Sequence, residues 1–179
     1  GQGDTIILES CEYCNSFLNF FPTTAVVLDI DADHLDFFKD INDIIHSFHE
    51  FAELTPMNGL VVVNHDDQNA MRAVAHIDRR IRTFGTTSDA DVYPTEIRDE
   101  NGYYRFTVNI DGKEYAKVAL SVPGRHNMLN ALACCAAAEF LGVPGEAAEK
   151  GLNKFTGSSP RFQLVGKMPN GATVVDDYA

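Results

Sequence analysis

Residues 4–36 read DTIILESCEYCNSFLNFFPTTAVVLDIDADHLD, and this stretch predicts how the fold is organised. It holds two short apolar runs, residues 5–8 and residues 24–30, and each run stops at polar residues that would be out of place in a core. Short, continuous apolar runs are typical of strands that are covered on both faces. We therefore expect two parallel strands of one sheet, with helices on either side.

The polar residues after these runs predict a metal site. Glu9 directly follows the first run, and His34 closes the turn Asp31-Ala-Asp-His34 after the second. Parallel strands bring both side chains to the carboxyl edge of the sheet, where open α/β sheets bind ligands. A carboxylate and an imidazole suit a divalent metal that carries phosphates. We expect Glu9 and His34 to be metal ligands and catalytic residues.

The rest of the chain predicts an α/β fold with a mostly parallel sheet flanked by helices. Apolar residues recur at helical spacing in two segments that alternate with further short apolar runs, a pattern typical of parallel sheets. Three segments of alternating apolar and polar residues follow, separated by Asn-Gly and Asp-Gly. This pattern predicts a small antiparallel insertion. The expected helices are 37–54, 67–77, 128–141 and 145–155, the further parallel strands are 59–64 and 81–84, the insertion is 91–122, and a last strand is 172–175.

The start of the alanine-rich helix at 128–141 carries two asparagines, Asn127 and Asn130. One interpretation is capping, because asparagine side chains satisfy free amides at helix starts. The other is recognition of a ligand edge such as a nucleobase, because one cap needs only one side chain. From these residues alone the two interpretations stand even. Further along, Arg161 lies in a loop where it is either solvated or close to a phosphate.

Size and charge limit the possible partners. The chain has 179 residues with 45% hydrophobic content, which is enough for one core, so we expect a single domain over 1–179. The formal net charge of −12 argues against a general nucleic-acid or anionic-membrane surface. No run has membrane-spanning length and no signal-peptide pattern is present, so we expect a cytoplasmic protein.

Four cysteines occupy positions 11, 14, 134 and 135. Cys11 and Cys14 have the spacing of a redox motif or of half a zinc site. The adjacent pair Cys134 and Cys135 points to different faces of a helix and makes a poor second half. We expect reduced thiols that pack as small apolar groups.

Taken in order, several motifs resemble those of the Mur ligase family. They are ESCEY at 9–13, SFLNFFPTTAVVLDIDADHLD at 16–36, PGRHNMLNALACCAAAEFLG at 123–142, RFQ at 161–163 and VVDDYA at 174–179. The resemblance implies the central, P-loop-NTPase-like domain of an ATP- and Mg²⁺-dependent amide-bond ligase of peptidoglycan precursor synthesis. The form of the first two motifs favours the member whose substrates are UDP-N-acetylmuramate and L-alanine. Such enzymes form an acyl phosphate on the muramoyl carboxylate, which the amine then attacks.

The resemblance also implies roles for single residues. Glu9 and His34 match the family's magnesium ligands, and Asn127 and Asn130 match its adenine-recognising asparagines, which favours the ligand interpretation of that pair. Arg161 matches an arginine near the nucleotide phosphates.

Asp176 directly follows the last expected strand. It matches a hinge aspartate of the family that binds ribose. Other parts of the family pattern are missing from this sequence: the glycine-rich phosphate loop ending in Gly-Lys-Thr, and the domains that bind the uridine nucleotide and the amino acid. We therefore expect an excised part that is inactive alone. The alternatives are another Mur-type or folate-type ligase domain, or a non-catalytic nucleotide-binding α/β module.

Overall fold

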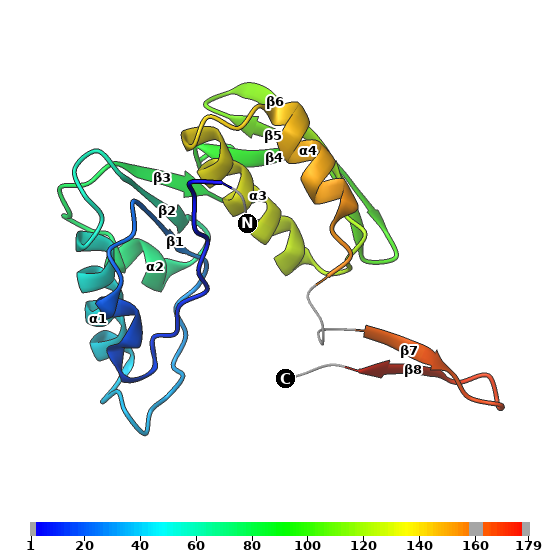
Figure 1. Ribbon diagram of the computed structural model, residues 1–179, viewed down its shortest axis with the longest axis horizontal. Coiled ribbons are helices and arrows are strands. Elements are labelled where there is room, and N and C mark those ends of the chain that lie inside the picture. The colour runs from blue at the N-terminus through cyan, green and yellow to red at the C-terminus, as the bar shows by residue number, and fades with distance from the viewer. Residues whose placement is uncertain (1–2, 158–162, 177–179) are drawn as a thin grey trace.

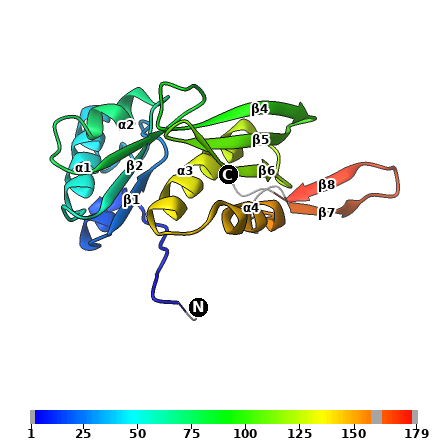
Figure 2. The ribbon, with the colours of Figure 1, turned by 90° about the horizontal axis from the view of Figure 1, so that it is seen from above.

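The computed structural model describes residues 3–157 and 163–176, and one large sheet organises it (Figure 1). The sheet has six strands in the order β1-β2-β3-β4-β5-β6, and a separate pair, β7 and β8, forms a hairpin. The strands are β1 (Thr24–Val27), β2 (Leu60–Asn64), β3 (Ile81–Phe84), β4 (Val92–Glu100), β5 (Tyr103–Ile110), β6 (Lys113–Ala119), β7 (Gln163–Lys167) and β8 (Thr173–Asp176). Both views show the hairpin extending away from the main body (Figures 1 and 2).

Helices cover both faces of the parallel half of this sheet. Helices α1 and α2 lie on one face, and α3 crosses the other face from β1 to β5 (Figure 1). The helical elements are the 3-10 segment η1 (Tyr13–Asn19), α1 (Ile41–Glu53), α2 (Gln68–Ala73), α3 (Arg125–Phe140) and α4 (Gly145–Lys154). Within the described ranges, none of the helices combines the length and apolar character needed to cross a membrane.

The central strand β2 explains why the parallel half folds. All five of its residues are buried, and neighbouring side chains alternate between the two faces. Val61 and Val63 pack in the core formed with α1 and α2, whereas Leu60 and Val62 pack in the core formed with α3. β2 pairs in parallel with β1 on one side and β3 on the other. The predicted helix-covered parallel sheet is confirmed.

The predicted antiparallel segment continues the same sheet. β4 joins β3 in parallel through the single pair Phe84 and Val92, and β4, β5 and β6 then form an antiparallel meander. The two turns use left-handed residues, with φ of 58° at Asn101 and 50° at Asp111, as Asn-Gly and Asp-Gly turns require. Helix α4 lies along β6, the last strand of this sheet (Figure 1).

The first predicted strand, residues 5–8, is a wrong prediction. These residues have no regular secondary structure, and the side chains of Ile6, Ile7 and Leu8 are 82%, 90% and 60% exposed. Figure 2 shows the segment leading away from the sheet. A four-residue apolar run becomes a strand only where another strand pairs with its backbone, and none of the strands in the described part of the chain does so.

A buried arginine ties α3 to the sheet. Arg82 of β3 is 6% exposed and forms ion pairs with Glu139 of α3 and, at 3.5 Å, with Asp111 of the β5–β6 turn. Glu139 and Asp111 keep 40% and 64% of their side chains exposed, so only the guanidinium depends fully on its partners.

We expect Glu139→Ala to lower the free energy of unfolding by about 2 kcal/mol, because it leaves a buried cation with Asp111 as its one remaining carboxylate partner. Arg82→Met is expected to cost less, about 1 kcal/mol, because methionine fills the space and the freed carboxylates are hydrated. Urea unfolding of the two variants and of the double variant measures this. A double variant less stable than Glu139→Ala alone would contradict the assignment.

Candidate functional site at the strand ends

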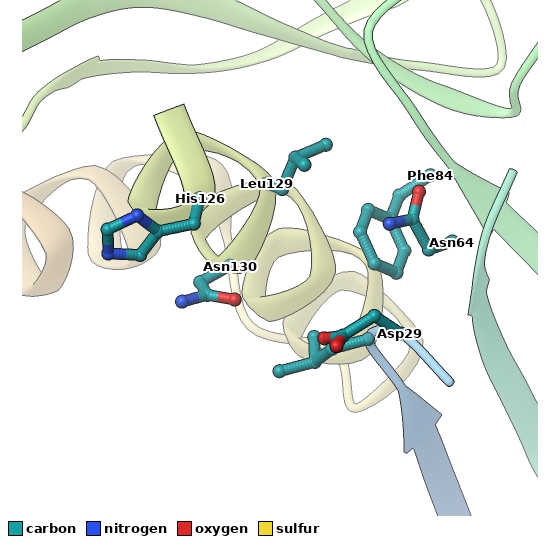
Figure 3. A pocket seen from close by; sticks show the side chains of 7 residues that line it. Asp29, Asn64, Phe84, His126, Leu129 and Asn130 are labelled. Carbon is teal, nitrogen blue, oxygen red and sulfur yellow. The ribbon is translucent and has the colours of Figure 1, made fainter. Parts of the chain in front are cut away.

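A cleft of about 270 Å³ opens where the carboxyl ends of three parallel strands meet the start of α3 (Figure 3). Strand ends contribute Leu28, Asp29, Asn64 and Phe84, and α3 contributes His126, Leu129 and Asn130. Its walls are mainly apolar, with a few polar groups converging on it, which is typical of small-molecule sites. The cleft lies at the edge of the sheet that the sequence predicted.

The strand register places these residues side by side. Val27, at the end of β1, pairs with Val63 of β2, and Asn64 pairs with Phe84 at the end of β3. The three strands therefore end at nearly the same level, and the next residues along β1, Leu28 and Asp29, reach the same opening. Asn64 also accepts a hydrogen bond from the backbone N–H of Asp66 at 3.0 Å, which fixes its side chain.

The two asparagines of α3 differ in their surroundings. The side-chain amide of Asn127 donates to the carbonyl of Pro123 at 2.7 Å, and α3 has no side-chain cap. Asn130 is exposed and lines the cleft, whereas Asn127 is not part of its lining. Gly124 precedes the helix with φ of 106°, and a Cβ there would lie 2.5 Å from the His126 ring. This glycine lets His126 fold back at the mouth of the cleft.

Electrostatics at the cleft favour a cation. Desolvation raises the pKa of Asp29, and the negative charges of Asp67, Asp31 and Glu12 raise it further. Because the pKa of Asp29 is higher in the folded state than in the unfolded state, ionised Asp29 destabilises the fold. This destabilisation grows as pH rises from the unfolded-state pKa to the folded-state pKa. A bound cation would relieve that cost.

His34 lies beside Glu12, one of these acidic residues. Its Nε2 is 3.2 Å from Oε1 of Glu12, and its ring centroid is 4.9 Å from that of Tyr13. The Tyr13 hydroxyl donates to Asp36 at 3.0 Å, and this hydrogen bond raises the pKa of Tyr13. Both His34 and Glu12 are half-buried. The imidazole is thus held between an aromatic ring and a carboxylate.

The other predicted site residues are placed as follows. Glu9 is exposed, and among the described residues His34 pairs with Glu12 rather than with Glu9. Asp176 is the last residue of β8, where its backbone pairs with Gln163. Arg161 lies outside the described residues.

Sequence reasoning missed Asp29, Asn64, Phe84 and Glu12. Both Asp29 and Asn64 could have been recognised, since Asp29 is a charged residue within the apolar run 24–30 and Asn64 is the polar residue that ends the run 59–64. The expectation for the cysteines is also partly wrong. All four are free, but only Cys135 is buried, where burial raises its pKa to about 12.

The family profile described as Mur ligase middle domain matches residues 3–138. The chain belongs to the Mur ligase family. The cleft therefore occupies the carboxyl edge of a Mur ligase central domain, and its strand ends and α3 residues all lie within the matched range.

Two relatives that match this Mur ligase chain carry the same name. This chain is 46% identical over 180 residues to the UDP-N-acetylmuramate–L-alanine ligase of Agathobacter rectalis, and 45% identical over 181 residues to that of Acetivibrio thermocellus. All of this chain is covered in both alignments, but it spans only 39% and 38% of those relatives.

Solved structures share the fold. The UDP-N-acetylmuramate-alanine ligase MurC from Thermotoga maritima superimposes with a TM-score of 0.74 at 26% identity, covering 92% of this chain and 36% of that chain. MurF from Acinetobacter baumannii gives a TM-score of 0.74 at 28% identity, covering 86% of this chain and 34% of that chain.

Proposed function

We propose that this chain is the nucleotide-binding part of an ATP-dependent ligase that joins L-alanine to UDP-N-acetylmuramate. The observation that carries the proposal is the cleft at three aligned strand ends, with Asn130 at its mouth, in a member of the Mur ligase family. The names of the relatives favour this ligase over the others of the family.

The cleft suits an adenine base. Its apolar walls, formed by Leu28, Phe84 and Leu129, offer surface for the faces of a flat ring. Asn130 carries a donor and an acceptor on one amide, which matches the adjacent N6 and N7 groups of adenine. Asn127 has one of its amide hydrogens engaged by Pro123 and keeps its oxygen for a ligand.

The phosphates would extend from the base toward Asp29, which lies just after the end of β1. We propose that Arg161 contacts them and that Asp176 binds the ribose, as the family resemblance implies. Desolvation raises the pKa of Asp29, and the nearby carboxylates that raise it further would repel bare phosphates. ATP therefore needs a divalent cation at this edge.

The chain's own residues fit Mg²⁺ at that place. Glu12 supplies a carboxylate oxygen and His34 a nitrogen 3.2 Å away, and Glu12 is close enough to Asp29 to raise its pKa. We propose His34, with Glu12 or Glu9, as ligands. When bound, Mg²⁺ neutralises charge on the phosphates and on the reacting carboxylate. His34 and its carboxylate partner hold this position, so their role is orientation rather than covalent chemistry.

The test is phosphate release by the full-length protein with ATP, Mg²⁺, UDP-N-acetylmuramate and single amino acids. We expect release that depends on both the muramate and L-alanine, with a new amide product visible by mass spectrometry. The 179-residue chain alone is the matched control, and we expect it to release no phosphate.

Other outcomes separate the remaining functions. Release that requires a tripeptide in place of L-alanine would indicate a sister ligase acting on the same muramic acid. Release with a folate and glutamate would indicate a folate-type ligase. A folded protein that binds ATP without turnover with any acceptor would leave a non-catalytic nucleotide-binding module.

A further inference from the structure

The two thiols of the Cys11-Glu-Tyr-Cys14 motif have no role in the proposed ligase reaction, yet Cys11 lies in a cluster of possible metal ligands. Ligand atoms of Cys11, Glu12 and His34 all lie within 4.8 Å of one another. We propose that these three residues form a binding site for a thiophilic divalent metal ion, Zn²⁺, with one coordination position open. The proposal rests on this geometry and does not depend on the proposed ligase activity.

The three donors come from two separate segments of the chain. Cys11 and Glu12 immediately precede η1, with Glu12 at its N-cap position, whereas His34 lies in the turn after β1. In a tetrahedral site with bonds of about 2.0–2.3 Å, ligand atoms lie roughly 3.5 Å apart. The Glu12 and His34 atoms, at 3.2 Å, already have nearly this separation. Only a small side-chain movement of the exposed Cys11 is needed to complete the set.

Hydrogen bonds hold the backbone of two of these metal-binding residues, Cys11 and His34, in place without a metal. The carbonyl of Cys11 accepts from the backbone N–H of Phe17 and from the hydroxyl of Ser16, both at 3.0 Å. The His34 carbonyl accepts from the backbone N–H groups of Phe37 and Phe38, at 2.9 and 3.0 Å. Both backbone positions are therefore fixed, and binding needs little reordering.

The donor set distinguishes the ion. One thiolate, one imidazole and one carboxylate match sites that bind zinc through three protein ligands and keep a fourth position for water or another ligand. Mg²⁺ prefers six oxygen donors and gains nothing from a thiolate. Cys11 is therefore the residue that separates this site from the proposed Mg²⁺ site, with which it shares His34 and, where Glu12 is the carboxylate ligand, Glu12. Zn²⁺ held by Cys11 would compete with Mg²⁺ there.

The structure also distinguishes this site from a Cys-x-x-Cys site. Cys14 is not in the cluster, although it lies only three residues from Cys11. The backbone turns at the second thiol, with φ of 54° at both Cys14 and Asn15. Cys14 is thus a matched control: a second exposed thiol in the same motif that lies outside the set of ligands.

The test is titration of the reduced 179-residue chain with Co²⁺, a spectroscopic substitute for Zn²⁺. Thiolate binding to Co²⁺ gives a charge-transfer band in the near ultraviolet, and tetrahedral Co²⁺ gives strong visible bands. We expect both to saturate near one Co²⁺ per chain. Zn²⁺ should remove them at one equivalent, whereas a large excess of Mg²⁺ should not.

Three variants assign the ligands, with circular dichroism confirming that each is folded. Cys11→Ser is expected to remove the charge-transfer band, Cys14→Ser to retain it, and His34→Ala to weaken Co²⁺ binding at least tenfold. Absence of the band in the unmodified chain would overturn the proposal, and so would its persistence in Cys11→Ser. Equal loss in Cys14→Ser would overturn it in favour of a Cys-x-x-Cys site.

Discussion

Replacing His34 by alanine in the full-length protein is expected to slow phosphate release by roughly 100-fold or more. The imidazole is held between Tyr13 and Glu12, beside the acidic end of β1 where the phosphates are proposed to lie. Without it the proposed cation would lose a fixed ligand, and the phosphates would lose their alignment with the reacting carboxylate. Initial rates over a range of Mg²⁺ concentrations measure the effect, because higher Mg²⁺ should restore part of the activity.

His46→Ala is the matched control for this variant. His46 is an exposed histidine on α1 whose nearest acidic partner, Glu50, is 3.8 Å away, so its removal should leave the rate unchanged. Comparable losses in His46→Ala and His34→Ala would point to a general effect on folding instead of a metal role. An unchanged rate in His34→Ala would remove this residue from the mechanism.

The same assay decides which glutamate acts with His34. The family resemblance favours Glu9, whereas Glu12 is the glutamate whose carboxylate lies 3.2 Å from the His34 imidazole. Glu9→Gln and Glu12→Gln each remove one charge at nearly constant volume, so the larger loss of rate identifies the ligand. Equal and small losses would show that neither carboxylate holds the cation.

Patterns in the sequence predicted the sheet where burial alone decides the structure. β2 is apolar over its whole length because both of its faces are covered, and such a run is visible without knowing its neighbours. The Asn-Gly and Asp-Gly turns were equally clear, because few residues adopt positive φ at low cost. Residues 5–8 have the same apolar character but no pairing strand, and a pattern of one segment cannot reveal its partner.

The candidate site was predictable as a place and only partly as a set of residues. The carboxyl edge of a parallel sheet follows from topology. Asn130 followed from its place near the start of the alanine-rich helix, which is α3 in the structure. Asp29, Asn64 and Phe84 meet only because the register aligns the ends of β1, β2 and β3. Register depends on pairing between distant segments, which no local spacing encodes.

Gly145→Ala is expected to destabilise the fold by about 3 kcal/mol or more, although it adds a single methyl group. A Cβ at Gly145 would lie 1.7 Å from the backbone carbonyl oxygen of Tyr115 and 2.8 Å from its carbonyl carbon. Neither atom belongs to a flexible side chain, so relief requires α4 to move away from β6. Thermal unfolding followed by circular dichroism measures the loss, expected as a decrease of roughly 6–12 °C in Tm.

That movement is costly because α4 satisfies the edge of the sheet. Glu149 and Asn153 of α4 accept hydrogen bonds from the backbone N–H groups of Lys117 and Ala119 on β6, at 3.0 and 2.7 Å. Moving α4 would break both bonds and expose the unpaired edge. Gly151→Ala, in the same helix and with no atom beyond its chain neighbours and the helix backbone within 4 Å of the added Cβ, should instead stabilise the fold by about 0.5–1 kcal/mol. Opposite signs for two Gly→Ala changes in one helix would locate the constraint at the α4–β6 contact, whereas a stable Gly145→Ala variant would show that α4 is free to shift.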